Sequence, residues 1–240
     1  MRLGARSQKK SLPENDAMTH RFWLMLNQSW KDAVEWDHPK MEIEQVVCPE
    51  NPGHRRSGRR LTDLSVILPS KHAADVVWTW QSELLVQDHV LVFIRENDLT
   101  GLTAKEVSAR IQRTSTLTPP RLWEIQVTGW GGMAPDAGID IVQSCPTCQY
   151  REYSIANPSR VIDPRQWDGS DFFMVWPLPR FVFLSDRAAR LLRDSRFTGM
   201  RIIPAEELPI KPGGTVSPGL LSRWMPRERA EALGGPLGIA

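Results

Sequence analysis

The sequence lacks several features that would assign it to a large functional class. None of its apolar runs approaches the roughly 18 residues needed to cross a bilayer, and its first segment, MRLGARSQKKSLPEND, has no apolar centre of the kind found in secretory signals. Lys and Arg together number 30 against 28 Asp and Glu, so the formal charge of +2 gives no bulk attraction to nucleic acid or to an anionic membrane. We therefore expect a cytoplasmic protein with no membrane partner.

Cysteine is scarce and odd in number. The chain has three cysteines, of which Cys145 and Cys148 form a CxxC and Cys48 stands alone. A disulfide framework would favour an even count, so three thiols fit a reducing compartment better. Two cysteines separated by two residues are either half of a metal site or a redox pair.

Two kinds of enzyme that use a CxxC are excluded by its surroundings. A nucleobase deaminase needs His-x-Glu upstream and Pro before the first cysteine, but no histidine has Glu two positions later, and Ser144 precedes Cys145. A thioredoxin-like pair opens a helix, whereas CPTCQYREYS leads into the turn-forming NPSRVIDP. The glycines of TGWGGMAPDAG precede no Gly-Lys-Ser/Thr and so form no phosphate loop. We predict no catalytic residues, although an enzyme with an unrecognised residue set stays open.

Composition divides the chain into three parts. Residues 1–19 are polar and without periodicity, which indicates a disordered leader or an upstream extension of a true start at Met18. Residues 20–210 are expected to form a single α+β body. Residues 211–240 are rich in Pro and Gly, and we expect a loosely attached tail with a possible short helix at RERAEAL.

Within the body, apolar patterns predict strands and two helices. Strands are expected in four segments: 22–26, 61–69, 104–113 and 121–130. Apolar residues at helical spacing predict a long helix over 73–97, and Ser185 is a suitable N-cap for a second helix, DRAARLLRDS. Each helix is followed by a Thr-Gly pair, in LTGL and in FTGM, where glycine can adopt the left-handed conformation that ends a helix.

The order of these features indicates a diverged internal duplication. Cys-Pro opens both units, Cys48 and Gly101 lie 53 positions apart, and Cys145 and Gly199 lie 54 apart. We predict two tightly packed pseudo-repeats with the order strand, helix, strand, over about 46–105 and 143–205, and a period near 97 residues. Chance agreement of short words is the alternative.

The two Cys-Pro sites together supply candidate metal ligands. Cys145 and Cys148 provide two, Cys48 a third, and His54 of CPENPGH is the natural fourth because Pro-Gly turns let a short loop curl back on an ion. Four protein ligands make a closed zinc site, which stabilises a fold and does not activate water. The alternatives are unpaired surface thiols, a buried Cys48 of purely apolar role, and a solvated His54.

Charged clusters offer a second kind of candidate site. HRRSGRR contains Arg55, Arg56, Arg59 and Arg60, which could bind phosphate or an acidic protein face, or could form a solvated loop. The carboxylates of VIDPRQWDGSDFF precede Pro or Gly or lie close to them and have no neighbouring nucleophile or histidine, so we interpret Asp163, Asp168 and Asp171 as turn residues.

Ten tryptophans are many for a chain of this length. Most are expected in the core, because a duplicated α+β body needs large residues between its layers. Tryptophan is enriched at protein–protein hot spots, so an exposed Trp130 or Trp167 would be the first candidate for a partner contact.

Taken together, RFWL, the Cys-Pro opening, LWEIQVTG, CPTCQ and FVFLSDRAARLLRDSRFTGMRIIPAEEL resemble the double-CxxCG motif proteins, known as immunity proteins of myxobacterial contact-dependent toxin systems. The resemblance covers roughly residues 20 to 210. Cys48, Cys145 and Cys148 match family cysteines, but the first knuckle here is CPENPGH and Gln149 stands where the family has Gly.

The resemblance implies a protein that binds and neutralises a cognate protein toxin without catalysis. A structural zinc fits this expectation, as does the absence of a recognisable catalytic set. The competing hypothesis is a zinc-ribbon-like nucleic-acid binding module that uses the basic loop 54–60, although the balanced charge makes nucleic acid the less favoured partner.

Overall fold

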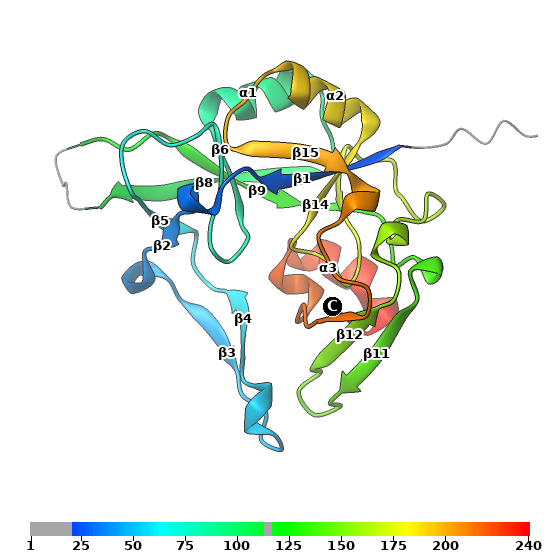
Figure 1. The fold of residues 1–240 in the computed structure, drawn as a ribbon. Helices are drawn as coiled ribbons and strands as arrows, with labels where there is room; N and C mark the ends of the chain where they lie inside the picture. Colours follow the sequence, from blue (N-terminus) through cyan, green and yellow to red (C-terminus); the bar gives the residue numbers. More distant parts are fainter. Residues whose placement is uncertain (1–20, 113–116) are drawn as a thin grey trace, which may run out of the picture.

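The computed structural model describes residues 21–112 and 117–240, and it is a mixed α+β fold in which sheets predominate, as the sequence predicts (Figure 1). The predicted leader, residues 1–19, lies outside the described residues. The largest sheet has the order β2 (Glu35–Trp36), β5 (Ser65–Leu68), β8 (Leu102–Ile111), β9 (Leu122–Val127), β7 (Leu84–Gln87), β6 (Val76–Trp78). The second has the order β10 (Gly129–Trp130), β13 (Phe172–Met174), β14 (Val182–Ser185), β1 (Phe22–Asn27), β15 (Met200–Pro204).

Two smaller sheets extend from this body. One is the hairpin of β3 (Ile43–Val46) and β4 (Arg56–Arg60), and the other joins β11 (Ile139–Ser144), β12 (Arg151–Ile155) and β16 (Gly214–Val216). The α-helices of the described residues are α1 (Asp88–Glu96), α2 (Asp186–Asp194) and α3 (Arg227–Gly234). Short 3-10 turns connect the strands: η1 (Trp30–Asp32), η2 (His38–Lys40), η3 (Pro52–His54), η4 (Pro135–Ala137), η5 (Pro158–Arg160), η6 (Ala205–Glu207), η7 (Leu221–Arg223) and η8 (Gly235–Leu237).

The same three-strand arrangement occurs in both large sheets. β9 lies between β7 and β8 and is antiparallel to both, and β1 lies between β14 and β15 in the same way. In each arrangement one of the two strands beside the middle strand leads directly into a helix: β7 into α1, and β14 into α2. Figure 1 shows the two helices side by side above the sheets.

β1 and β9 are the middle strands of these two arrangements, and each has a tryptophan that contacts the first residue of a helix. The Trp123 indole donates to the Asp88 carboxylate at 2.9 Å, and the Trp23 indole donates to Asp186 at 3.0 Å. Arg121 lies over the Trp123 ring and Arg193 over the Trp23 ring. Because Asp88 and Asp186 are the first residues of their helices, each carboxylate also lies at the positive end of the helix dipole.

The Thr-Gly pairs after the helices fasten the two sheets to each other. Gly101 and Gly199 have φ angles of +84° and +87°, and a Cβ on either would collide with a backbone carbonyl of the opposite sheet. Asp171 accepts hydrogen bonds from the Thr100 backbone and hydroxyl, and Asp75 accepts the equivalent pair from Thr198. Glycine is therefore required at both positions by conformation and by space.

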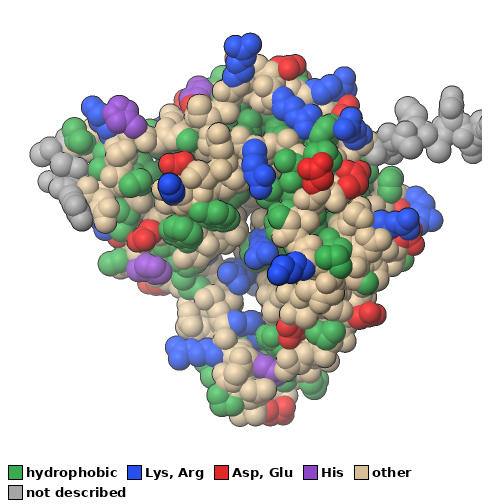
Figure 2. Space-filling model, viewed as in Figure 1, with side chains coloured by type: hydrophobic (Ala, Val, Ile, Leu, Met, Phe, Trp, Pro, Cys, Tyr) green, Lys and Arg blue, Asp and Glu red, His purple; other side chains and the backbone are tan. Residues whose placement is uncertain are grey.

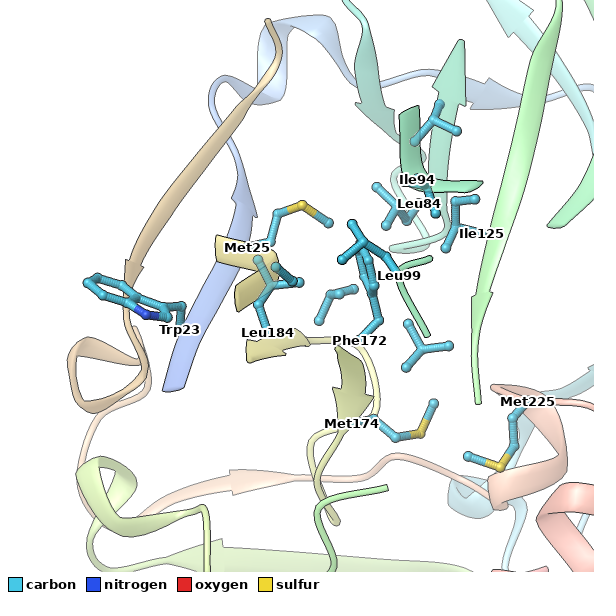
Figure 3. Packing of buried hydrophobic residues seen from close by; sticks show 14 of the residues in the cluster. Trp23, Met25, Leu84, Ile94, Leu99, Ile125, Phe172, Met174, Leu184 and Met225 are labelled. Carbon is cyan, nitrogen blue, oxygen red and sulfur yellow. The ribbon is translucent and has the colours of Figure 1, made fainter. Parts of the chain in front are cut away.

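The largest of three apolar clusters, called the main core here, contains residues of both large sheets and of the helices. In Figure 3, side chains from β1 and β14 such as Met25 and Leu184 meet Leu84 and Ile125 of the other large sheet. Runs such as Leu84–Val86 and Phe172–Met174 are buried at every position, because these strands are covered on both faces.

The predicted long helix over 73–97 is wrong in its first two thirds. β6 and β7 occupy this stretch as an antiparallel pair, joined by a turn in which Ser82 has φ +79°, and α1 begins only at Asp88. When a strand is buried on both faces, nearly every residue is apolar, so some of them lie at helical spacing by chance. For this reason apolar periodicity predicted a helix where β6 and β7 form. The second predicted helix is confirmed, since the Ser185 hydroxyl accepts from the Ala188 backbone at 3.1 Å and α2 follows it.

The expectation of a loosely attached tail is also wrong. β16 pairs with β12, and α3 covers the RERAEAL segment. The tail is anchored in the main core by Leu221, Met225, Ala230 and Ile239. Its Pro and Gly residues make the turns that bring these few apolar side chains inward. A high content of Pro and Gly therefore does not by itself indicate a loosely attached segment.

Candidate metal centre

The two hairpins carry the candidate ligands at their tips. The loop between β3 and β4 contains Cys48 and His54, and the loop between β11 and β12 contains Cys145 and Cys148. In the first loop, η3 places His54 at its end, and the Asn51 side chain caps the turn by accepting from the Gly53 backbone at 2.9 Å. Figure 1 shows both hairpins extending from the body toward the same side.

The four predicted ligands come together. Their ligand atoms all lie within 4.8 Å of one another, with 3.8 Å between the sulfurs of Cys48 and Cys145 and 3.7 Å between Cys148 Sγ and His54 Nδ1. In a tetrahedral site with Zn–S bonds of about 2.3 Å, neighbouring sulfurs are about 3.8 Å apart. The three cysteines form no disulfide. The spacing and chemistry of this donor set therefore fit a zinc-sized ion.

Surrounding side chains hold the His54 ring in position. The ring stacks on Tyr150, with 4.4 Å between centroids and an interplanar angle of 4°. Nδ1 faces the sulfurs, and Nε2 lies 3.0 Å from the Asn51 amide and 3.1 Å from that of Gln143. The Tyr150 stack and the two amide nitrogens together hold the ring with Nδ1 toward the sulfurs, which is the orientation that ligation through Nδ1 needs.

Arg56 neutralises charge at the thiolates. Its guanidinium donates to the Cys148 backbone oxygen at 2.6 Å and lies 3.6 Å from Cys148 Sγ. Burial would raise the pKa of the Cys148 thiol, but the Tyr150 backbone N–H and Arg56 lower it to about 7. Hydrogen bonding from the Cys148 backbone lowers the pKa of Cys145, whereas burial raises that of Cys48.

The candidate ligands are largely shielded from solvent, since Cys48, Cys145 and His54 have 2%, 7% and 7% of their surfaces exposed. Binding of all four side chains to one ion in a tetrahedral site would leave no coordination position for a water. Such a site holds chain segments together. Here the segments are hairpin tips 97 residues apart in the sequence.

The other predicted site residues are dispersed. Of the basic loop, Arg56 lies at the metal centre, Arg55 is exposed beside it, and Arg59 and Arg60 lie further along β4. Arg60 pairs with Glu124 of β9 at 2.5 Å. The loop is therefore not one continuous basic patch.

Trp130 and Trp167, which were predicted to contact a partner if they were exposed, are not exposed. Trp130 is 9% exposed and belongs to the main core, and Trp167 packs against Phe22 and donates to the Ser170 carbonyl at 3.0 Å. The exposed pair is instead Trp30 and Trp80, at 51% and 54%, whose rings stack with centroids 5.6 Å apart. The polar surroundings of Trp30 in NQSWKD were the available signal for this pair.

Two of the clustered carboxylates act as predicted for turn residues, because Asp163 and Asp168 accept from backbone N–H groups two positions later. For Asp171 the prediction is wrong, since this side chain joins distant segments. Asp163 accepts from the Arg165 backbone at 3.0 Å, and Asp168 accepts from the Trp130 backbone at 3.0 Å. Asp171 accepts from the Ser185 hydroxyl at 2.7 Å in addition to Thr100.

No helix in the described part of the chain is long and apolar enough to span a bilayer. Comparison with known proteins finds no protein-family model that matches the sequence, and a search of curated proteins gives no match either.

Proposed function

We propose that this chain is a non-catalytic binding protein of the immunity type, which neutralises a cognate protein toxin in the cytoplasm and whose scaffold is fastened by one structural zinc ion. The observation that carries the proposal is the buried Cys48, His54, Cys145 and Cys148 cluster, which joins two hairpins through a closed set of ligands. When bound, zinc would supply a rigid crosslink and no reactive water. The resemblance to double-CxxCG motif proteins supplies the toxin as partner.

We further propose that the body is a diverged duplication in which each half lends its first strand to the other. Support comes from contacts that occur twice: β1 with β14 and β15, β9 with β7 and β8, and the two Trp–Asp hydrogen bonds. The sequence words R-F-W at 21–23 and R-L-W at 121–123 begin these strands. Exchanged strands would make the halves inseparable, which suits a rigid scaffold that presents a binding surface.

The alternative hypothesis of nucleic-acid binding by loop 54–60 is less favoured, because some of its arginines form contacts within the protein. Arg56 is bound at the metal centre and Arg60 to Glu124, so two of the four guanidinium groups are occupied within the protein. Nucleic-acid binding by this loop would weaken steeply with salt, which gives a direct way to recognise it.

The proposed function is tested by co-expression. The product of the gene adjacent to this one is expressed in a laboratory bacterium, with and without this protein, and surviving cells are counted. We expect toxicity that this protein relieves, together with a complex that co-purifies. A Cys145→Ser variant should protect less, and Ser144→Ala, which changes a neighbouring residue that is not a ligand, should protect fully.

The proposal is wrong if the neighbouring product is harmless, or if toxicity persists although both proteins are folded and present. Zinc content of the freshly purified protein tests the scaffold separately. One equivalent of zinc is expected in the wild type and none in Cys145→Ser.

A further inference from the structure

A groove runs between the β3–β4 hairpin, the sheet formed by β7, β9 and β8, and the tail. It contains a cavity of about 810 Å³ and a second of about 480 Å³. The two share lining residues, including Pro179, Arg180, Arg223 and Trp224, so they form one continuous depression, named here the basic groove. Figure 2 shows Lys and Arg side chains gathered around a hollow near the middle of this face.

The groove is lined by an excess of cations: Arg59, Arg60, Lys105, Arg180, Arg223 and Arg227. Two of them are neutralised, Arg60 by Glu124 and Arg227 by Glu231. No carboxylate of the described residues forms an ion pair with the other four. The carboxylates of Asp63, Glu83 and Glu124 also line the groove, so its lining has six cations against three carboxylates and an excess of positive charge.

Arg223 lies at the centre of this excess, because it borders both cavities. Its guanidinium rests on the Trp224 ring at 4.9 Å. Burial lowers the pKa of Arg223, and the only opposing effect is the longer-range attraction of Glu83. A half-buried cation without a hydrogen-bonded carboxylate loses hydration, and an anion entering the groove would offset that loss.

An exposed apolar side chain borders each of the two cavities. Leu61, 55% exposed, borders the larger cavity, and Trp80, 54% exposed and stacked on Trp30, borders the smaller one. Exposed aromatic anchors beside arginines are typical of protein–protein hot spots. A ligand that fits this pattern carries negative charge for the shared arginines and apolar groups for Leu61 and Trp80.

We propose that the basic groove binds an extended, acidic segment of a partner protein, whose carboxylates pair with Arg59, Arg180 and Arg223 and whose apolar side chains contact Leu61 and the Trp30–Trp80 pair. The inference rests on the protein-binding part of the proposed function. Residues 1–19 of this chain carry four basic and two acidic side chains, so they lack the complementary charge. Scattered cations in a long groove suit several carboxylates along a chain better than one compact anion.

The test uses two synthetic, fluorescein-labelled peptides of equal length. One has alternating Glu and Asp in its middle and Leu at its ends, and the other has Gln and Asn in place of the acids. We expect the acidic peptide alone to bind, with an affinity that falls as salt is added. The double variant Arg180→Gln/Arg223→Gln should bind at least about tenfold more weakly. The control Arg160→Gln/Arg201→Gln, which removes two exposed arginines outside the groove, should bind like the wild type.

Three results would overturn the inference: equal binding of both peptides, unchanged affinity in the groove double variant, or tighter binding of a single-stranded oligonucleotide that the same variant abolishes. Zinc content and thermal unfolding confirm that each variant is folded. If the double variant does not fold, Arg180→Glu replaces it, because this side chain is exposed and a reversed charge there still predicts weaker binding.

Co-expression separates this inference from the proposed function. If the groove variant still protects cells fully, the groove is not the toxin-binding surface although the immunity function stands. If the acidic peptide binds in the groove but the neighbouring product is harmless, the immunity function fails and the groove remains a binding site.

Discussion

β1 and β11 are both six residues long, but four residues of β1 are buried and none of β11 is. The strands of the other metal-bearing hairpin, β3 and β4, also contain no buried residue. Burying an apolar side chain stabilises a fold by about 1.5–3 kcal/mol, so the four buried side chains of β1 contribute on the order of 6–12 kcal/mol. The sheet body is held by apolar burial. In the two hairpins that carry the candidate ligands, only β12 buries side chains, so we expect β3, β4 and β11 to depend on the ligands at the hairpin tips.

Removing the proposed metal should cause the largest loss of stability, and this loss should be confined to the hairpins. Structural zinc sites in small peptides are worth on the order of 10 kcal/mol, and β3, β4 and β11 bury no side chain that could replace such a crosslink. After treatment with a strong chelator, hydrogen exchange should accelerate in β3, β4 and β11 while β1 and β9 keep their protection. Loss of protection throughout the body would show that the sheets, like the hairpins, depend on the metal for their stability.

Replacing a glycine between the sheets should produce the next largest loss, this time in the body. Gly199→Ala combines a left-handed backbone with a collision against the Val76 carbonyl, and should lower the free energy of unfolding by about 3 kcal/mol or more. Gly213→Ala is the matched control, because its φ is +71° but nothing lies near the added Cβ; about 1 kcal/mol is expected. Urea unfolding measures both, and equal losses would show that the close contact is unimportant.

The tail should behave as part of the body. Met225→Ala removes a side chain that is 3% exposed in the main core, and should destabilise the protein by about 2–4 kcal/mol. Val92→Ala, an apolar truncation at an exposed position of α1, should change stability by less than about 0.5 kcal/mol. If thermal unfolding of Met225→Ala matched the wild type, the tail would be an appendage and not a structural layer.

The smallest expected effect is a pH-dependent one at Asp75. Burial would raise the pKa of this carboxyl, but hydrogen bonds from Thr198 and the charge of His89 lower it below its ordinary value. Its contribution, about 1 kcal/mol, should be fully present above the unfolded-state pKa of about 4 and disappear as pH falls through the lower folded-state pKa.

Asp75→Asn should therefore be less stable than the wild type at neutral pH and converge with it in acid. Urea unfolding at several pH values measures the difference. Asp140→Asn, at an exposed carboxylate of β11 with no described ion pair, should show no such trend. A constant difference for Asp75→Asn at all pH values would mean that charge plays no part.

Local sequence signals predicted the features that depend on local chemistry. The Ser185 cap and the grouping of Cys48, His54, Cys145 and Cys148 follow from residue types and short spacings, and the structure has both. The prediction that Gly101 and Gly199 end the helices is wrong, because the left-handed residues at the helix ends are Asp98 and Arg196, three positions earlier. His54 was predicted because a tetrahedral site needs a fourth ligand, and the structure places it beside the three sulfurs although its spacing from Cys48 is longer than is usual in zinc knuckles.

Features that depend on distant partners were decided only by the tertiary structure. Val76–Trp78 and Leu84–Val86 form strands and not helix because each pairs with a neighbour and is covered on both faces, which no local periodicity reveals. The burial of Trp130 and exposure of Trp80 likewise depend on which sheet covers them. The basic groove exists only because hairpin, sheet and tail, far apart in the sequence, fold around one space, so its charge excess is a property of the assembled surface and not of any single motif.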